Sequence, residues 1–285
     1  MCSPGPPQNR WRHHAWHRPP GRALLLDRPA TRRGPGRQRH RSGSHQPWRR
    51  FGDSAQSRSY PSGDAPQNEG RILVNDDPRI GPLIAELRER GVTDAAVLAA
   101  IEGVPREIFV SEPFKARAYE NVALPIGRHQ TISQPLVVGL MTQALELTDR
   151  TKVLEVGTGS GYQTAVLSPL CRRIYSIERH PQLHDEAESR FRRLGLTNIT
   201  AIIGDGSAGW PGQAPFERII VTAAAEDVPM VLLNQLAIGG LMIIPIGVDE
   251  HDQRLMRVTR TAEGAETEDM GAVRFVPLLP GIADK

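Results

Sequence analysis

The sequence lacks the features that mark secreted, membrane and thiolate-metal proteins. Only two of its 285 residues are cysteine, Cys2 and Cys171, which excludes a disulfide scaffold and a cysteine-based zinc site. It contains no run of about 18 apolar residues, so we expect no transmembrane helix. The apolar run at residues 23–26 is shorter than the ~7–15 residues of a signal-peptide core. A cytoplasmic location is therefore expected.

Lysine is absent from residues 1–70, although this part carries the excess of positive charge. It holds 13 arginines against four acidic residues, whereas residues 71–285 hold 22 basic and 28 acidic residues. Ten prolines, eight glycines and no hydrophobic periodicity predict a disordered Arg/Pro/Gly-rich extension over residues 1–70. Such a composition buries too little apolar surface to offset the entropy of ordering the chain. Residues 71–285 are expected to form the globular domain.

Two interpretations of the extension stay open. Three tryptophans interleaved with the arginines are suited to contacting phosphates and stacking on bases, which would make it a nucleic-acid or membrane-surface tail. The alternative is a solvated tail without a role, or translated upstream sequence. We favour the alternative and expect no stable nucleic-acid or membrane partner.

The first part of the domain, residues 71–147, is predicted to be helical. Apolar residues spaced three and four apart predict a helix that Gly91 ends, and Thr93 is expected to cap a second helix. Residues 121–135 contain a glycine and two prolines and are predicted to form an extended loop, followed by a helix over about 136–147. The loop carries His, Gln, Thr and Ser, side chains suited to lining a site.

A strand over residues 152–156 runs directly into the glycine-rich segment 157–161, and a helix follows. This order is typical of a nucleotide-binding βαβ unit, in which glycines let the backbone approach a ligand. Glu178 ends the next strand, 21 residues after Gly157, the spacing of an acid that accepts hydrogen bonds from both ribose hydroxyls. Residues 148–285 are therefore predicted to be a cofactor-binding α/β core.

The glycine pattern is not that of a dinucleotide site. The dinucleotide pattern would place a glycine at position 162, where this sequence has Tyr162. Glu155, two residues before the first glycine, would repel a pyrophosphate but suits a cation. S-adenosyl-L-methionine carries a sulfonium and an ammonium group and no phosphate. The residues therefore favour S-adenosyl-L-methionine over NAD as the cofactor.

Alternation of strands and helices continues and implies a mainly parallel, Rossmann-like sheet with helices on both faces. Further helices are predicted at 181–194 and 228–236, and further strands at 173–177, 199–203, 217–221, 241–246, 254–259 and 272–276. Ligands gather at the carboxyl ends of such strands. Gly157, Glu178, Asp205 and Thr222 all fall there. Asp205 could accept the adenine amino group or be a plain turn aspartate.

A metal site is not expected. His180 and His184 are four residues apart, but no further ligand follows at a metal-binding spacing.

Several motifs resemble those of the protein-L-isoaspartate O-methyltransferases over about residues 78–280. They are Val-Pro-Arg-Glu at 104–107, Ala-Leu-Pro-Ile-Gly at 123–127, Gln-Thr-Ile-Ser-Gln-Pro at 130–135, the glycine loop at 154–164 and Arg-Phe-Val-Pro-Leu at 274–278. The resemblance implies methyl transfer from S-adenosyl-L-methionine to the free α-carboxylate of L-isoaspartyl residues, the first step in repairing damaged proteins and peptides. The family pattern is not kept at residues 136–139, which carry no polar or histidine side chain.

The resemblance also implies roles for individual residues. Ser133 matches the serine at the reaction centre, and the substrate-binding segment matches Gln130, Thr131 and Ile132. The cofactor-binding positions match Glu155, Gly157, Thr158, Gly159, Glu178, Asp205 and Gly206. A carboxylate substrate, with a pKa near ~3.5, is already a nucleophile and needs no general base. Ser133 is therefore expected to orient the substrate; the alternative is that it caps the following helix.

We expect a monomer whose partners are isoaspartyl-containing proteins and peptides. Two alternatives stay open at this stage. One is a small-molecule O-methyltransferase of the same fold. The other is a nucleic-acid-binding module that acts through the basic extension.

Overall fold

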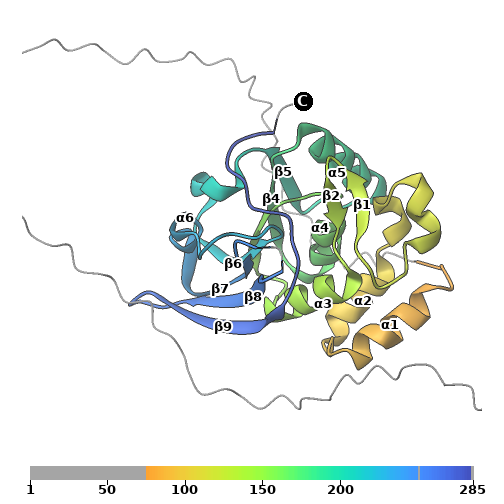
Figure 1. The fold of residues 1–285 in the computed structure, drawn as a ribbon, viewed down its shortest axis with the longest axis horizontal. Coiled ribbons are helices and arrows are strands. Elements are labelled where there is room, and N and C mark those ends of the chain that lie inside the picture. The colour runs from red at the N-terminus through yellow and green to blue at the C-terminus, as the bar shows by residue number, and fades with distance from the viewer. Residues whose placement is uncertain (1–74, 250, 284–285) are drawn as a thin grey trace, which may run out of the picture. The chain divides into compact units, whose positions relative to one another are not determined.

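The computed structural model describes residues 75–249 and 251–283, so the predicted extension of residues 1–70 lies outside the described part. Its centre is a seven-stranded sheet in the order β5-β4-β3-β6-β7-β8-β9 (Figure 1). The first five of these strands are parallel, and β8 and β9 are antiparallel to their neighbours. The strands are β3 (Lys152–Val156), β4 (Arg173–Glu178), β5 (Ile199–Ile203), β6 (Phe216–Val221), β7 (Leu236–Ile246), β8 (Arg254–Arg260) and β9 (Ala265–Ala272).

Six α-helices and five short 3-10 helices accompany the described strands. The α-helices are α1 (Ile80–Glu89), α2 (Ala95–Gly103), α3 (Pro135–Ala144), α4 (Tyr162–Leu167), α5 (Pro181–Leu194) and α6 (Met230–Leu233). The 3-10 helices are η1 (Arg106–Phe109), η2 (Glu112–Arg117), η3 (Ser168–Leu170), η4 (Gly206–Ala208) and η5 (Pro211–Gln213). The predicted Rossmann-like α/β fold with additional amino-terminal helices is confirmed.

Both faces of the central strands β3, β6 and β7 are buried because these strands are apolar at successive positions. Val153 and Ile220 pack on one face with Met141 of α3 and Leu167 of α4. The opposite face packs against α6 and includes Leu154, Ile219, Met242 and Val258. The helices α1 and α2 pack outside α3 and α4 and share a further core cluster with them. This layering fixes the carboxyl ends of β3, β4 and β6 at one edge, where the site lies.

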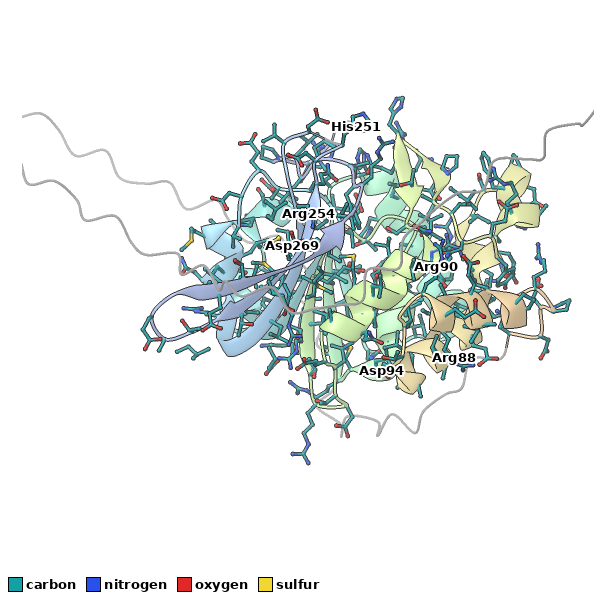
Figure 2. All side chains as sticks on the ribbon, turned by 60° about the horizontal axis from the view of Figure 1, so that its bottom comes forward. Arg88, Arg90, Asp94, His251, Arg254 and Asp269 are labelled. Atoms are coloured by element: carbon teal, nitrogen blue, oxygen red, sulfur yellow. The ribbon has the colours of Figure 1, made fainter. Side chains whose placement is uncertain are left out.

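The amino-terminal helices follow the predicted periodicity with one correction. The predicted apolar stripe of α1 is buried, and Gly91 follows the helix with a φ of 104°. The cap of α2 is Asp94 rather than Thr93, because the Asp94 carboxylate accepts hydrogen bonds from the amides of Ala96 and Val97. Figure 2 shows Asp94 where α2 begins, close to Arg88 and Arg90 at the end of α1.

The predicted extended loop at residues 121–135 contains a hairpin. Its strands are β1 (Leu124–Gly127) and β2 (Gln130–Ile132), which pair antiparallel. Arg128 and His129 form the turn with φ values of 52° and 57°. Pro125 is accommodated because β1 pairs on one side only, so its missing amide hydrogen leaves no partner unsatisfied.

Two further predictions near the carboxyl terminus were wrong. The helix predicted at 228–236 is the single turn of α6, and Leu236 instead begins β7 and pairs with Phe216. The strand predicted at 272–276 is displaced, because β9 ends at Ala272.

The antiparallel pair β8–β9 is joined by an ion pair in which Arg254 and Asp269 meet across the strands at 2.9 Å (Figure 2).

The chain after β9 forms what we call the C-terminal segment, residues 273–283. It leaves the sheet at β9 and runs back across the carboxyl ends of the central strands (Figure 1). The amide of Ala224, just after β6, donates to Val276 at 2.8 Å, and the amide of Leu278 donates to the Ala224 carbonyl at 2.7 Å. At its end the amide of Ala283 donates to the Arg179 carbonyl at 2.9 Å.

No helix within residues 75–249 and 251–283 is both long and apolar enough to cross a membrane.

Candidate active site

A cleft of about 1280 Å³ opens at the carboxyl ends of β3, β4 and β6. It is bounded by the β1–β2 hairpin with the residues after it, by the glycine loop, and by the C-terminal segment. Nine of the eleven predicted site residues line it: Gln130, Thr131, Ile132, Ser133, Gly157, Thr158, Gly159, Glu178 and Gly206. Glu155 and Asp205 are the two that do not.

The glycine loop has a backbone that larger residues would strain. Gly157, Gly159 and Gly161 have φ values of 96°, 55° and 89°, the left-handed region that favours glycine. A Cβ atom on Gly157 would lie 2.3 Å from Oγ1 of Thr222, and one on Gly161 would lie 2.7 Å from the Phe191 ring. The Thr222 hydroxyl is also within hydrogen-bonding distance of the Gly157 carbonyl, at 2.7 Å. The loop is therefore held in one shape, and its residues 157–160 line the cleft.

Glu178 contacts the glycine loop as well as the cleft. Its Oε2 accepts a hydrogen bond from the amide of Gly159 at 2.7 Å, and its Oε1 accepts one from the amide of His180 at 2.9 Å. The side chain is nearly buried, yet the residue lines the cleft. Each carboxylate oxygen can accept a further hydrogen bond. The arrangement therefore suits an acid that receives hydroxyl groups of a bound ligand.

Glu155 lies behind the glycine loop rather than in the cleft. The carboxyl is fully buried and accepts hydrogen bonds from the hydroxyls of Thr164 at 2.5 Å and Ser176 at 2.6 Å. The Ser176 hydroxyl also lies 2.6 Å from that of Thr158, so this network reaches the loop. The other carboxyl oxygen, Oε1 of Glu155, has no hydrogen-bond partner among the described residues. Burial raises the pKa of Glu155 to about 7, although the two hydroxyls lower it in part.

Asp205 connects the end of β5 to the C-terminal segment. Its Oδ1 accepts hydrogen bonds from the amide and the hydroxyl of Ser207, so that Asp205 caps η4. Its Oδ2 accepts one from the amide of Gly281 at 2.8 Å. Although partial burial opposes ionisation, these hydrogen bonds hold the pKa of Asp205 below its usual value. The neighbouring Gly206 is the residue that lines the cleft.

Ser133 lies between β2 and α3, where two other residues hold the backbone. Arg106 donates to the Ser133 carbonyl at 2.9 Å, and Gln134 donates to the Asn121 carbonyl at 2.8 Å. The residue that caps α3 is Gln134, and its cap involves no side-chain hydrogen bond. Ser133 is therefore not the helix cap, and its hydroxyl belongs to the wall of the cleft.

Of the basic and imidazole side chains around the cleft, the sequence indicated only His129, in the loop expected to line a site. The described lining residues include one acid, Glu178, and five basic or imidazole side chains: His129, Arg179, His180, His251 and Arg274. Arg274 belongs to a motif that the sequence had singled out without a role. His251 precedes β8 in a loop without a recognisable pattern, and it lies beyond the end of the sheet in Figure 2. Such a rim favours an anionic substrate.

Among residues 75–249 and 251–283, no group of three or more His, Cys, Asp or Glu side chains is arranged to hold a metal ion.

The sequence profile of the protein-L-isoaspartate(D-aspartate) O-methyltransferases matches residues 79–282. The chain belongs to this family. One relative, the protein-L-isoaspartate O-methyltransferase of Paramagnetospirillum magneticum, is 59% identical over 210 residues, which cover 73% of this chain and 98% of the relative. That of Rhodospirillum rubrum is 64% identical over 202 residues, covering 70% and 92%.

Solved structures agree with this membership. A protein-L-isoaspartate O-methyltransferase structure with 27% sequence identity superposes with a TM-score of 0.65, covering 72% of this chain and 67% of that one. A Plasmodium falciparum structure in complex with S-adenosyl-L-homocysteine has 24% identity and a TM-score of 0.60, covering 70% and 97%. The second likeness shows the fold that this methyltransferase family shares.

Proposed function

We propose that this chain transfers a methyl group from S-adenosyl-L-methionine to the free α-carboxylate of L-isoaspartyl residues in damaged proteins and peptides. The proposal rests on one observation: the residues expected to bind the cofactor and those expected to bind the substrate line two walls of the same cleft. The glycine loop and Glu178 form one wall, and the segment of residues 130–133 forms the other. A cofactor site and a substrate site thus meet at the ends of the same strands.

The residues present fit S-adenosyl-L-methionine. Gly157 and Gly159 line the cleft, and Glu178 offers oxygen acceptors for the two ribose hydroxyls. Glu155 places a titratable carboxyl behind the loop, where a cationic ligand favours its ionised form. When bound, the cofactor supplies the electrophilic methyl group. Gly206 bounds the cleft beyond β5, next to the acid predicted to meet the adenine.

The chain's own residues need only position the substrate. The substrate carboxylate is ionised at neutral pH, so neither a proton acceptor nor a covalent intermediate is required. The Ser133 hydroxyl donates a hydrogen bond to one carboxylate oxygen, which leaves the other aligned for attack. Gln130, Thr131 and Ile132 form the wall along which the substrate backbone lies. The basic rim, which includes His129 and Arg274, attracts the negative charge.

The product explains why methylation starts a repair. A methyl ester is a better electrophile than an ionised carboxylate, because it can expel methanol. The neighbouring backbone amide nitrogen therefore attacks the ester carbonyl carbon, the bond to the methoxy oxygen breaks, and methanol leaves with the amide proton without further catalysis. The succinimide that forms is hydrolysed in part to a normal aspartyl bond. The enzyme therefore contributes only the methyl transfer.

We also propose that the chain acts as a monomer in the cytoplasm, with isoaspartyl-containing proteins and peptides as its transient partners and without a stable nucleic-acid or membrane partner. The scarcity of cysteine in the sequence supports a reducing compartment. Comparing salt-dependent nucleic-acid binding by the full chain and by residues 71–285 tests the absence of such a partner.

One experiment tests the activity. The chain is incubated with S-adenosyl-L-methionine carrying a tritiated methyl group and with a peptide that contains one L-isoaspartyl residue. We expect base-labile radioactivity on this peptide and none on the matched aspartyl peptide. Catechols and small carboxylic acids are tested in parallel. Labelling of a small molecule without labelling of the isoaspartyl peptide would favour the small-molecule O-methyltransferase instead.

A further inference from the structure

Arg106 is the largest fully buried side chain of the described residues, with 0% exposure. It begins η1, in the Val-Pro-Arg-Glu motif, and does not line the cleft. Within residues 75–249 and 251–283 it forms no ion pair with a carboxylate. Removing a guanidinium from water without a counter-charge is costly, and an apolar side chain of similar volume would fill the same space at less cost. A role in packing alone therefore does not explain an arginine here.

The guanidinium instead connects several backbone segments. Its Nε donates to the Ala118 carbonyl at 2.8 Å, and its Nη2 donates to the carbonyls of Val122 at 3.3 Å and Ser133 at 2.9 Å. Its Cζ lies 4.6 Å from the ring centroid of Tyr162, the first residue of α4 after the glycine loop. One side chain thus contacts the substrate wall and the residue that follows the cofactor loop.

The backbone from the Ser133 carbonyl onward is fixed by these contacts and those of Asn121. Arg106 holds the Ser133 carbonyl, and Asn121 holds the next residues by accepting hydrogen bonds from Gln134 and from the amide of Leu136. The Ser133 side chain therefore projects from a backbone whose direction depends on a buried cation. The fork of a guanidinium reaches three carbonyls at once, which an ammonium group on a lysine stem cannot do in the same plane.

We propose that Arg106 is a positioning residue for methyl transfer: its hydrogen bond to the Ser133 carbonyl sets the Ser133 hydroxyl toward the substrate carboxylate. The proposal rests on the function proposed above. It assigns Arg106 no contact with the substrate or the cofactor. Its loss would misalign the substrate while the glycine loop and Glu178 keep the cofactor.

The structure offers a matched control for packing. Phe109 lies in the same 3-10 helix, is equally buried, and contacts the same Tyr162 ring edge-on at 5.5 Å. It has no hydrogen bond to the Ser133 backbone. Phe109→Leu therefore disturbs the packing of η1 and Tyr162 without removing the guanidinium that holds Ser133.

The test compares Arg106→Lys, Arg106→Met and Phe109→Leu with the wild-type chain. For each variant, kcat and KM for an isoaspartyl peptide are measured at saturating cofactor, Kd for S-adenosyl-L-homocysteine by calorimetry, and Tm by circular dichroism. We expect Arg106→Met to lower kcat by about 10–100-fold with Kd changed less than about threefold. Arg106→Lys should fold and recover only part of the loss. Phe109→Leu should lower Tm but keep kcat within about threefold of the wild type.

Two results would overturn the proposal. The first result is that the folded Arg106→Lys variant keeps kcat within threefold of the wild type, and that Arg106→Met does so too if this variant folds. The other is an equal loss of kcat in Phe109→Leu. If Arg106→Met does not fold, Arg106→Lys decides alone. An inactive wild-type chain would instead contradict the proposed function.

Discussion

The carboxylate of Asp205 accepts a hydrogen bond from the backbone amide of Gly281 at 2.8 Å, across 76 positions of the chain. The acid that the sequence places near the adenine thus also holds the C-terminal segment. Its other oxygen is occupied by Ser207. Cofactor binding and the order of the C-terminal segment are therefore expected to depend on the same side chain.

Replacing Asp205 tests this double role. Asp205→Ala should weaken affinity for S-adenosyl-L-homocysteine by about 10-fold, because it removes the cap of η4, whose first residue Gly206 lines the cleft. It should also speed hydrogen exchange of the amide of Gly281. Ser207→Ala is the control, since it removes only the hydroxyl that donates to Asp205. Unchanged exchange at Gly281 in Asp205→Ala would contradict the hydrogen bond.

Ser133→Ala should lower turnover and leave cofactor affinity unchanged. The loss of an orienting hydrogen bond to the substrate should cost about 10–1000-fold in kcat, while the glycine loop remains intact. Because Gln134 rather than Ser133 caps α3, Tm should change little. Single-turnover methyl transfer and melting are measured on the same preparation. A destabilised but fully active variant would refute the assignment.

Glu178→Ala should weaken cofactor binding by about 10–100-fold, because the ribose hydroxyls lose their acceptors and the Gly159 amide loses its partner. Calorimetry with S-adenosyl-L-homocysteine measures the change. Glu188→Gln is a suitable control, since that acid pairs with Arg192 on α5 and neither residue lines the cleft. An unchanged Kd in a folded Glu178→Ala variant would remove Glu178 from the site.

The buried carboxyl of Glu155 should make stability depend on pH. Its pKa is raised from an ordinary 4.5 to about 7, so the folded chain binds more protons than the unfolded chain between these values. The contribution of Glu155 to the stability of the folded chain is complete below pH 4.5 and is lost as the pH rises through 7. The free energy of unfolding of Glu155→Gln, relative to that of the wild type, should rise by at most on the order of 3 kcal/mol between pH 4.5 and pH 8. Urea denaturation at several pH values measures it, and a pH-independent difference would contradict the shift.

Deleting residues 1–70 should leave kcat/KM on short isoaspartyl peptides unchanged, because every residue proposed to line the site or to position it lies at or beyond Arg106. A longer deletion, of residues 1–79, serves for comparison. It removes Arg79, which pairs with Asp77 and donates to the Ala116 carbonyl at 2.9 Å, so Tm should fall. A marked loss of activity in the shorter deletion would assign the extension to the enzyme.

The glycine loop and Glu178 could be predicted because their signals are local. A strand, a glycine turn and an acid at a fixed distance follow from the sequence alone. The partners of Asp205 and Glu155 could not, since Gly281 and Ser176 reach them only through the fold. The burial of Glu155, which changes its pKa, depends on the same long-range packing.

The wrong elements have comparable causes. Residues 228–236 form an apolar run, and such a run does not distinguish a buried helix from the start of a strand. The β1–β2 hairpin was missed because Gly127 and Pro125 usually interrupt strands, whereas a two-stranded ribbon tolerates both. The sequence indicates Arg106 only as part of a motif, because the burial of a charged side chain cannot be predicted from its neighbours in the sequence.

The C-terminal segment joins three strand ends through Arg179, Asp205 and Ala224. Tension applied at residue 283 would therefore act on the mouth of the cleft before it reached the sheet. Hydrogen bonds that lie end to end along a pulled chain break one after another. Under load from that side, the hydrogen bonds of Arg179, Asp205 and Ala224 at the mouth of the cleft carry the force first.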